Sequence, residues 1–174
     1  SVLAPPGEYT VTLRAGAVAN SQPLTVLKDP DSGGSEAEIA VQFELVEEIA
    51  VAIQVSQLLT QQIDTIRGQL TDLIEALGND ADTGDIRSGA ERLDASFTAL
   101  ADSLVQQKPG GFYMWPVRLT SKLIYLSSHV QSSDYQPTSQ AREAHAFLMG
   151  LLGVAQADYV RLVGDTLVDF NELL

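Results

Sequence analysis

The sequence contains no cysteine, which excludes disulfides, thiolate metal sites and cysteine nucleophiles. Basic residues are also scarce: 10 Lys and Arg stand against 23 Asp and Glu, for a net charge of −13. A surface this acidic disfavours a nucleic-acid backbone or an anionic lipid surface as partner. No stretch approaches the ~18 uninterrupted apolar residues of a membrane-spanning helix. The richest long stretch, Ala144 to Val163, is broken by His145, Asp158 and Arg161. We therefore expect no nucleic-acid partner and no membrane span.

Motifs that would indicate catalysis or a cofactor are missing too. A di-metal helical bundle needs Glu-x-x-His, but His129 follows Leu126 and His145 follows Arg142 at that spacing. The chain has no Gly-x-Ser-x-Gly elbow and no glycine-rich phosphate loop. The loop 80–85 resembles a calcium loop, but its Gly and Asp stand in the wrong order. We expect no catalytic residue, no cofactor and no metal, and we interpret the acidic cluster 44–48 as a solvated helix face.

One stretch organises the rest of the sequence. Ser35 to Leu77 reads as a single long helix that opens with a capping box, Ser35 and Glu38, and stops at Gly78. A helix of roughly 40 residues would be about 60 Å long, so other helices must pack along it. The hydrophobic fraction of 45% and the mean hydropathy of +0.06 are those of a folded protein.

Apolar residues at helical spacing predict three further helices. The predicted helices cover residues 35–77, 85–107, 116–134 and 138–174, with Asp85 and Thr138 as N-caps and Pro116 in a first turn. Because the connections are short, the predicted fold class is mainly α: a four-helix up-down-up-down bundle with two long helices, preceded by a short β-hairpin. Helices two and three could together cover one flank of the first.

Residues 1–34 differ in kind from the rest. Glu8 to Leu13 and Pro23 to Leu27 have the composition of short strands, Ala15 to Ser21 is a connector, and 28–34 is a turn-rich linker. Two strands alone are marginal in water. We expect this hairpin to be the remnant of an upstream β-sandwich, which makes the chain a C-terminal fragment of a larger protein. The alternative is that the strands pack on the helices.

Two stretches are candidate interaction surfaces. The segment Ile49–Ile53, together with Val55, is apolar nearly all round the helix, so it should touch more than one neighbour. The loop Phe112–Trp115 concentrates aromatic residues at one end of the bundle, as a plug over the core or as a docking surface. The residues we select as a possible interaction surface are Val51, Val55, Phe112, Tyr113, Met114 and Trp115.

Several short motifs resemble a known group of proteins. They are Pro6–Leu13, Pro23–Val26 and Lys28–Pro30 in the first part, and Pro116-x-Arg118-Leu119, Pro137-Thr138 and Asp169-Phe170-Asn171-x-x-Leu174 in the helical part. The first set resembles the close of a small β-sandwich in large bacterial proteins with sortilin-like or sialidase-like (BNR-repeat) β-propellers, and the second resembles their C-terminal tail. The resemblance implies a parent protein similar to glycosyl hydrolases, an extracytoplasmic location, and upstream domains of that parent as partners. The Asp-box motif of the propeller is absent, so no catalytic residue carries over.

Together these observations predict a non-catalytic C-terminal accessory or assembly domain, which acts by packing against its parent protein or by forming a homodimer. The alternative is a helical bundle that binds a small molecule or a peptide in a groove near Gly150, Gly153 and Trp115, because the two glycines leave room beside a helix.

Overall fold

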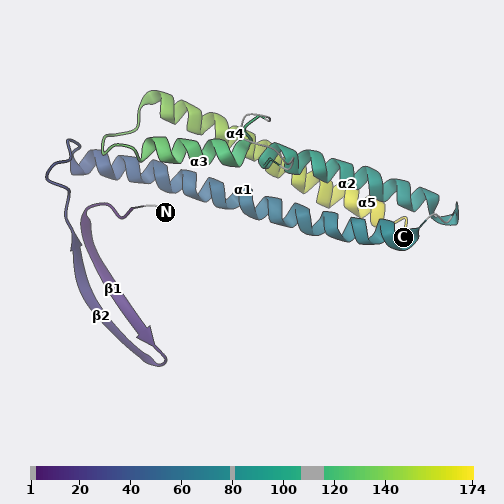
Figure 1. Ribbon diagram of the computed structural model, residues 1–174, viewed down its shortest axis with the longest axis horizontal. Helices are drawn as coiled ribbons and strands as arrows, with labels where there is room; N and C mark the ends of the chain where they lie inside the picture. The colour runs from purple at the N-terminus through teal and green to yellow at the C-terminus, as the bar shows by residue number, and fades with distance from the viewer. Residues whose placement is uncertain (1–2, 79–80, 107–115) are drawn as a thin grey trace.

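The computed structural model describes residues 3–78, 81–106 and 116–174. These residues form an N-terminal antiparallel hairpin and four long helices (Figure 1). The elements are β1 Gly7–Ala15, β2 Val18–Val26, α1 Glu36–Leu77, α2 Gly84–Leu104, α3 Leu119–Val130 and α4 Ser139–Arg161. A 3₁₀ turn, Ala81–Thr83, precedes α2, and a π-helical turn, Leu162–Thr166, joins α4 to a last helix, α5 Leu167–Asn171. The predicted class, mainly α with four helices and an N-terminal hairpin, is confirmed.

Helix α1 begins at the predicted capping box. The Ser35 hydroxyl accepts from the backbone N–H of Glu38 at 3.2 Å, and the Glu38 carboxylate accepts from the backbone N–H of Ser35 at 2.9 Å. The Ser35 hydroxyl also donates to the Glu38 carboxylate, at 2.8 Å. The two bonds that this carboxylate accepts hold the pKa of Glu38 below its usual value, the bond from the Ser35 backbone N–H contributing most and the bond from the Ser35 hydroxyl next. Gly78 ends the helix with a positive φ of 57°, which a residue without Cβ adopts readily.

The capping box leads to a pH-dependent prediction. We expect Ser35→Ala to lower the free energy of unfolding by about 1 kcal/mol at neutral pH. Because the folded-state pKa of Glu38 is depressed, its contribution is present above the ordinary pKa of 4.5 and is lost as the pH falls through the lower folded value. The cost of Ser35→Ala should therefore shrink in acid. Urea unfolding at neutral and acid pH measures this, with Glu36→Gln, in the same turn but outside the box, as the control.

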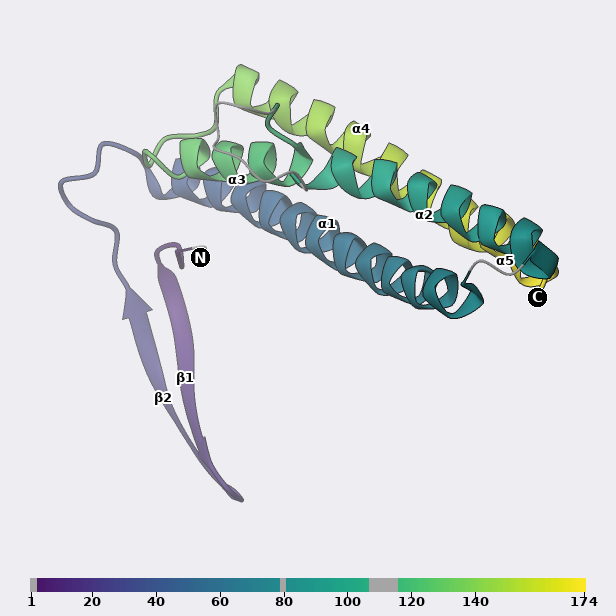
Figure 2. The ribbon, with the colours of Figure 1, turned by 45° about the vertical axis from the view of Figure 1, so that its right-hand side comes forward.

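Helices α2 and α3 lie end to end along α1 and run in the same direction, opposite to α1 (Figures 1 and 2). Three side-chain contacts record this order. Going back along α1, Arg67 meets Asp94 of α2, Ser56 meets Thr120 of α3, and Gln42 reaches Val130 at the end of α3. Helix α4 then returns alongside, in the direction of α1.

The predicted up-down-up-down order is therefore wrong at the step from the second helix to the third. The lengths give the reason. At 1.5 Å per residue α1 is ~63 Å long, while α2 and α3 are ~32 and ~18 Å. Neither short helix alone can cover the apolar stripe of α1, but the two placed in line cover it over most of its length. The expectation that helices two and three share one flank of the first is confirmed.

Several predicted helix ends differ from the structure. The N-cap of α2 is Thr83 rather than Asp85, and it makes no side-chain capping bond. Helix α3 starts at Leu119, three residues after Pro116, so Pro116 is not in its first turn. It ends at Val130, with Gln131 as its C-cap, and not near residue 134 as predicted. The predicted cap of α4 is confirmed, because the Thr138 hydroxyl accepts from the backbone N–H of Ala141 at 3.2 Å. The local sequence therefore predicts the region in which a helix ends, but not the residue at which it ends.

The core follows a seam of α1 at alternating spacings of three and four residues. Its buried members are Gln42, Leu45, Val46, Ile49, Ala52, Ser56, Leu59, Ile63 and Leu70. Against it pack the predicted stripes of α2 and α3, with Phe97 and Leu123 fully buried. Ile39 and Phe43, near the start of α1, are apolar at helical spacing but only half-buried, so the buried part of the seam begins at Gln42.

Two seam positions are polar and find partners on other elements. The Gln42 amide donates to the backbone oxygens of Val130, at 2.7 Å, and of Ser133. The Ser56 hydroxyl lies 2.7 Å from that of Thr120, which also donates to the Leu104 carbonyl at 3.0 Å. These bonds satisfy groups at the ends of α2 and α3, so buried polar residues fix where the two short helices stop along α1.

The hairpin extends well beyond the predicted strands. β1 and β2 pair from Gly7 with Val26 to Ala15 with Val18, so most of the predicted connector 15–21 belongs to β2. Only Gly16 and Ala17 form the turn, and the φ of 60° at Gly16 is that of the first central residue of a tight hairpin turn. The hairpin projects away from the helices in both views (Figures 1 and 2).

Candidate interaction surface on helices α3 and α4

Helix α4 carries more apolar surface than the core covers. With its continuation to Asn171 it spans 33 residues, and its most apolar window has a mean hydropathy of 1.4. Among the described residues it passes the length and composition test for a membrane span. The core helix of a soluble protein passes the same test, so this does not by itself indicate a span. A core helix would be mostly buried, however, and here only 22% of the window is buried. Most of the apolar surface of α4 is therefore exposed to solvent, and this exposure requires an explanation.

Part of this surface forms a groove of about 630 Å³ between α3 and α4. Its floor is made by Leu126, Ala141 and Leu148, which are buried. The small side chains of Ala141 and Ala144 keep the two helices from filling the space between them. The remaining lining residues are Val117, Ser121, Lys122, Tyr125, His129, Thr138, Gln140 and Phe147. Most of these contribute carbon atoms, and Lys122, Tyr125 and His129 are the titratable groups in the lining.

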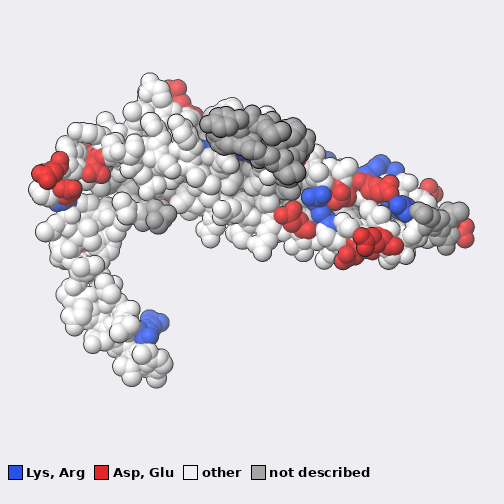
Figure 3. All heavy atoms as spheres, viewed as in Figure 1, with Lys and Arg blue, Asp and Glu red and all other residues white. Residues whose placement is uncertain are grey.

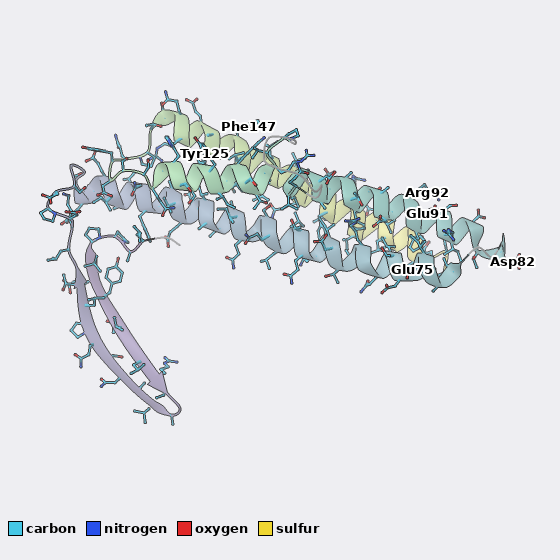
Figure 4. All side chains as sticks on the ribbon, in the orientation of Figure 1. Glu75, Asp82, Glu91, Arg92, Tyr125 and Phe147 are labelled. Carbon is cyan, nitrogen blue, oxygen red and sulfur yellow. The ribbon has the colours of Figure 1, made fainter. Side chains whose placement is uncertain are left out.

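Two aromatic side chains stand on the rims of the groove. Tyr125, on α3, is 75% exposed, and Phe147, on α4, is 63% exposed. Figure 4 shows them on neighbouring helices near the start of α4. A large aromatic residue that stays in water gains nothing from the fold of its own chain. Aromatic residues in this position are typical of surfaces that become buried when a partner binds.

A neutral belt, formed by two stretches without Asp, Glu, Lys or Arg on α1 and α4, lies beside the groove, whose own lining includes Lys122 of α3. On α1 it covers residues 49–63 and on α4 residues 144–157. The two stretches lie at the same level, because Glu48 and His145, at their edges, are 3.7 Å apart. Fourteen helical residues correspond to ~21 Å. On the face in Figure 3, charged side chains gather towards the two ends of the helices, and few appear in the part of the middle that grey atoms leave visible. This neutral belt is unusual in a chain of net charge −13.

The predicted interaction residues are only partly related to this surface. Val51 is 58% exposed on α1, so it belongs to the belt, whereas Val55 is half-buried and packs against the core. Neither lines the groove. The aromatic residues Phe112, Tyr113, Met114 and Trp115 lie outside the described residues. Sequence reasoning missed Tyr125 and Phe147. The charge-free run 144–157 of α4 could have indicated Phe147, whereas Tyr125, on α3, has no such signal.

Neither Gly150 nor Gly153 lines the α3–α4 groove, and Trp115 lies outside the described residues, so the predicted groove near these three residues stays a prediction. A Cβ atom at either glycine would meet nothing within 4 Å, so no other helix approaches them closely among the described residues. Both lie on the outward side of α4, beyond the groove. They keep part of the exposed face of α4 flat, which suits a broad contact rather than a narrow pocket.

The structure places the other chemical candidates apart from one another. His145 faces α1, where its Nδ1 lies 3.7 Å from the exposed Glu48 carboxylate, and His129 lines the groove. Glu44, Glu47 and Glu48 are all exposed, as expected for a solvated face. Within residues 3–78, 81–106 and 116–174, no group of three His, Cys, Asp or Glu side chains could hold a metal ion.

No protein-family model matches this sequence, and no curated protein or solved structure matches it either. The account of this surface therefore rests on its own geometry. An apolar groove with aromatic rims, beside a neutral belt, can bury an apolar partner, because Lys122, the one Asp, Glu, Lys or Arg of its lining, is exposed and can stay in water. No side-chain hydrogen bond or ion pair joins any two of the lining residues Ser121, Lys122, Tyr125 and His129 in the described part of the chain.

Proposed function

We propose that this chain is a non-catalytic assembly module that holds a partner protein against α3 and α4, with an apolar helix of the partner lying in the groove. The observation that carries the proposal is the 22% burial of an α4 window with a mean hydropathy of 1.4. Uncovered apolar surface of this kind, rimmed by polar residues, is typical of protein–protein contact sites. By the sequence resemblance, the partner would be another domain of a larger propeller-containing protein.

The occupant is inferred from the shape and chemistry of the surface. The groove lies between two helices, as in proteins that bind an amphipathic helix by its apolar face. The neutral belt extends ~21 Å along α4, the length of a helix of about 14 residues. Since the belt offers no carboxylate, it would not repel the neutral or acidic side chains of such a helix, and Lys122 at the rim favours an acidic residue beside it.

The test uses a defined probe, a stapled and fluorescein-labelled amphipathic peptide of about 14 residues with one Leu- and Ala-rich face. We expect the wild-type chain to bind it. We expect Phe147→Glu to raise the Kd about tenfold or more, since binding would bury a carboxylate in an apolar groove. Fluorescence anisotropy measures the Kd.

The matched control is Val160→Glu, which places the same charge on an exposed position of α4 outside the groove lining. This variant should bind as the wild type does. Equal Kd values for Phe147→Glu and Val160→Glu, or no binding by the wild type, would contradict the proposal. Both positions are exposed, so neither variant should change the unfolding midpoint by much.

A second candidate function is the binding of a small apolar molecule in the same groove. Its volume of about 630 Å³ lies in the range of ligand pockets and favours this alternative. The neutral dye Nile red separates the two functions. Saturable one-to-one dye binding that Phe147→Glu abolishes, without binding of the peptide, would favour the small-molecule function.

A further inference from the structure

The hairpin is a two-stranded sheet with two free edges. β1 and β2 pair with each other and with no other strand of the described residues. Alternation along the strands puts five apolar or aromatic residues on one face, Tyr9, Val11, Leu13, Val18 and Leu24, together with Asn20 and Gln22. Tyr9 is half-buried, but the rest of this face is largely uncovered: Leu13 is 73% and Val18 71% exposed. A two-stranded hairpin with both edges and its apolar face in water is marginal. It needs further strands.

The two edges of this hairpin are not equivalent. Thr10 pairs with Pro23, and because proline has no N–H this must be a pair whose backbone groups point outward from the hairpin. Outward-pointing pairs alternate with hydrogen-bonded ones, so Glu8, Thr12 and Arg14 also present their backbone groups to the outer edge of β1. The outer edge of β2 lacks a donor at Pro23, near its middle, whereas the edge of β1 is complete. A new strand would therefore add to β1.

The sequence of β1 is complementary to itself when two copies run antiparallel about Val11. In that register Glu8 lies opposite Arg14 of the second copy, Thr10 opposite Thr12, and Tyr9 opposite Leu13. The backbone geometry is compatible with this register. In the opposed pairs Glu8–Arg14 and Thr10–Thr12, the backbone N–H and C=O groups of both residues point outward, so the two copies can exchange hydrogen bonds. Each acidic side chain therefore lies opposite a basic one, each hydroxyl opposite a hydroxyl, and each apolar or aromatic side chain opposite another.

We propose that two copies of the chain associate through their β1 edges, forming one four-stranded antiparallel sheet in the order β2-β1-β1-β2 around a two-fold axis at Val11. The pairing joins the apolar faces of two hairpins into one larger face. It also gives Arg14, which has no ion-pair partner among the described residues, the Glu8 carboxylate of the second copy. This surface is separate from the α3–α4 groove, so the proposal does not rest on the proposed function.

A charge exchange tests the register. Within one strand Glu8 and Arg14 lie six residues, or ~20 Å, apart, so they cannot pair in the same copy. Arg14→Glu puts like charges opposite each other at both ends of the pairing, and we expect the Kd of the dimer to rise about tenfold or more. The double variant Glu8→Arg, Arg14→Glu restores opposite charges and should restore the wild-type Kd, although it loses the Thr25 hydrogen bond to Glu8. Light scattering after size exclusion, over a concentration series of the full chain, measures the mass.

A second pair of variants tests which edge is used. Thr12→Pro and Ser21→Pro each remove one outward N–H, and each loses the same 2.8 Å contact between the Thr12 and Ser21 hydroxyls. Only Thr12 lies on the β1 edge. We expect Thr12→Pro to be monomeric and Ser21→Pro to remain a dimer. A wild-type chain that stays monomeric at every concentration, Arg14→Glu that dimerises as the wild type does, or a dimer that Phe147→Glu disrupts while Arg14→Glu does not, would overturn the proposal.

Discussion

Replacing Phe97 by alanine is expected to lower the free energy of unfolding by about 3–5 kcal/mol. Phe97 is fully buried on α2, at the centre of the core that α1, α2 and α4 share. Its removal loses the transfer free energy of an aromatic ring and leaves a cavity that the surrounding helices cannot fill without moving. A loss of this size is a large part of the stability of a single domain.

Urea unfolding followed by circular dichroism measures this effect, and the dependence on denaturant should stay unchanged while the midpoint falls. Phe147→Ala is the matched control, because it removes the same ring from an exposed position of α4. It should change the free energy of unfolding by less than about 1 kcal/mol. Similar losses at both positions would mean that Phe147 is buried in solution, and would contradict the exposed groove rim as well.

Gln42→Leu is expected to lower the free energy of unfolding by about 1–3 kcal/mol, although it makes the core more apolar. The Gln42 amide donates to the backbone oxygens of Val130 and Ser133, which lie at and just beyond the end of α3. Leucine leaves both oxygens without this donor, and a buried acceptor that loses its partner costs about 1–3 kcal/mol. The effect should appear first as fraying where α3 ends.

Hydrogen exchange locates the damage, because the amides of the last turn of α3 should lose protection before those of α2. The control is Gln57→Leu, which makes the same change at an exposed position of α1. Its free energy of unfolding should stay within about 0.5 kcal/mol of the wild type. Should Gln42→Leu instead stabilise the chain, the amide would not be capping α3, and the seam of α1 would be an ordinary apolar one.

The two proposed contact surfaces lie on different parts of the molecule and can be altered separately. The hairpin offers backbone groups and a self-complementary strand, which suits a second copy of the chain. The α3–α4 groove offers apolar side chains and aromatic rims, which suits a helix of another protein. A dimer joined at β1 would carry two such grooves, so each assembly could hold two partner helices.

Much of the helical structure could be predicted from the sequence because its signals are local. The capping box of Ser35 and Glu38, the stop at Gly78, the cap at Thr138 and the stripes of α2 and α3 each depend on residues within a few positions of one another. The mainly α class and the hairpin followed from the same signals. The propeller-containing parent remains a prediction from loose motifs.

What only the tertiary structure decided depends on residues far apart in the chain. Short loops predict antiparallel neighbours, but α2 and α3 run the same way because only both together can cover α1. Gln42 and Ser56 read as polar breaks in an apolar stripe, and their partners are 88 and 64 residues away. Likewise, the apolar residues of α4 read as core from spacing alone. Periodicity shows which residues are apolar on one face of a helix. Only the packing of the other helices shows which of these apolar residues remain exposed to solvent, as Tyr125 and Phe147 do.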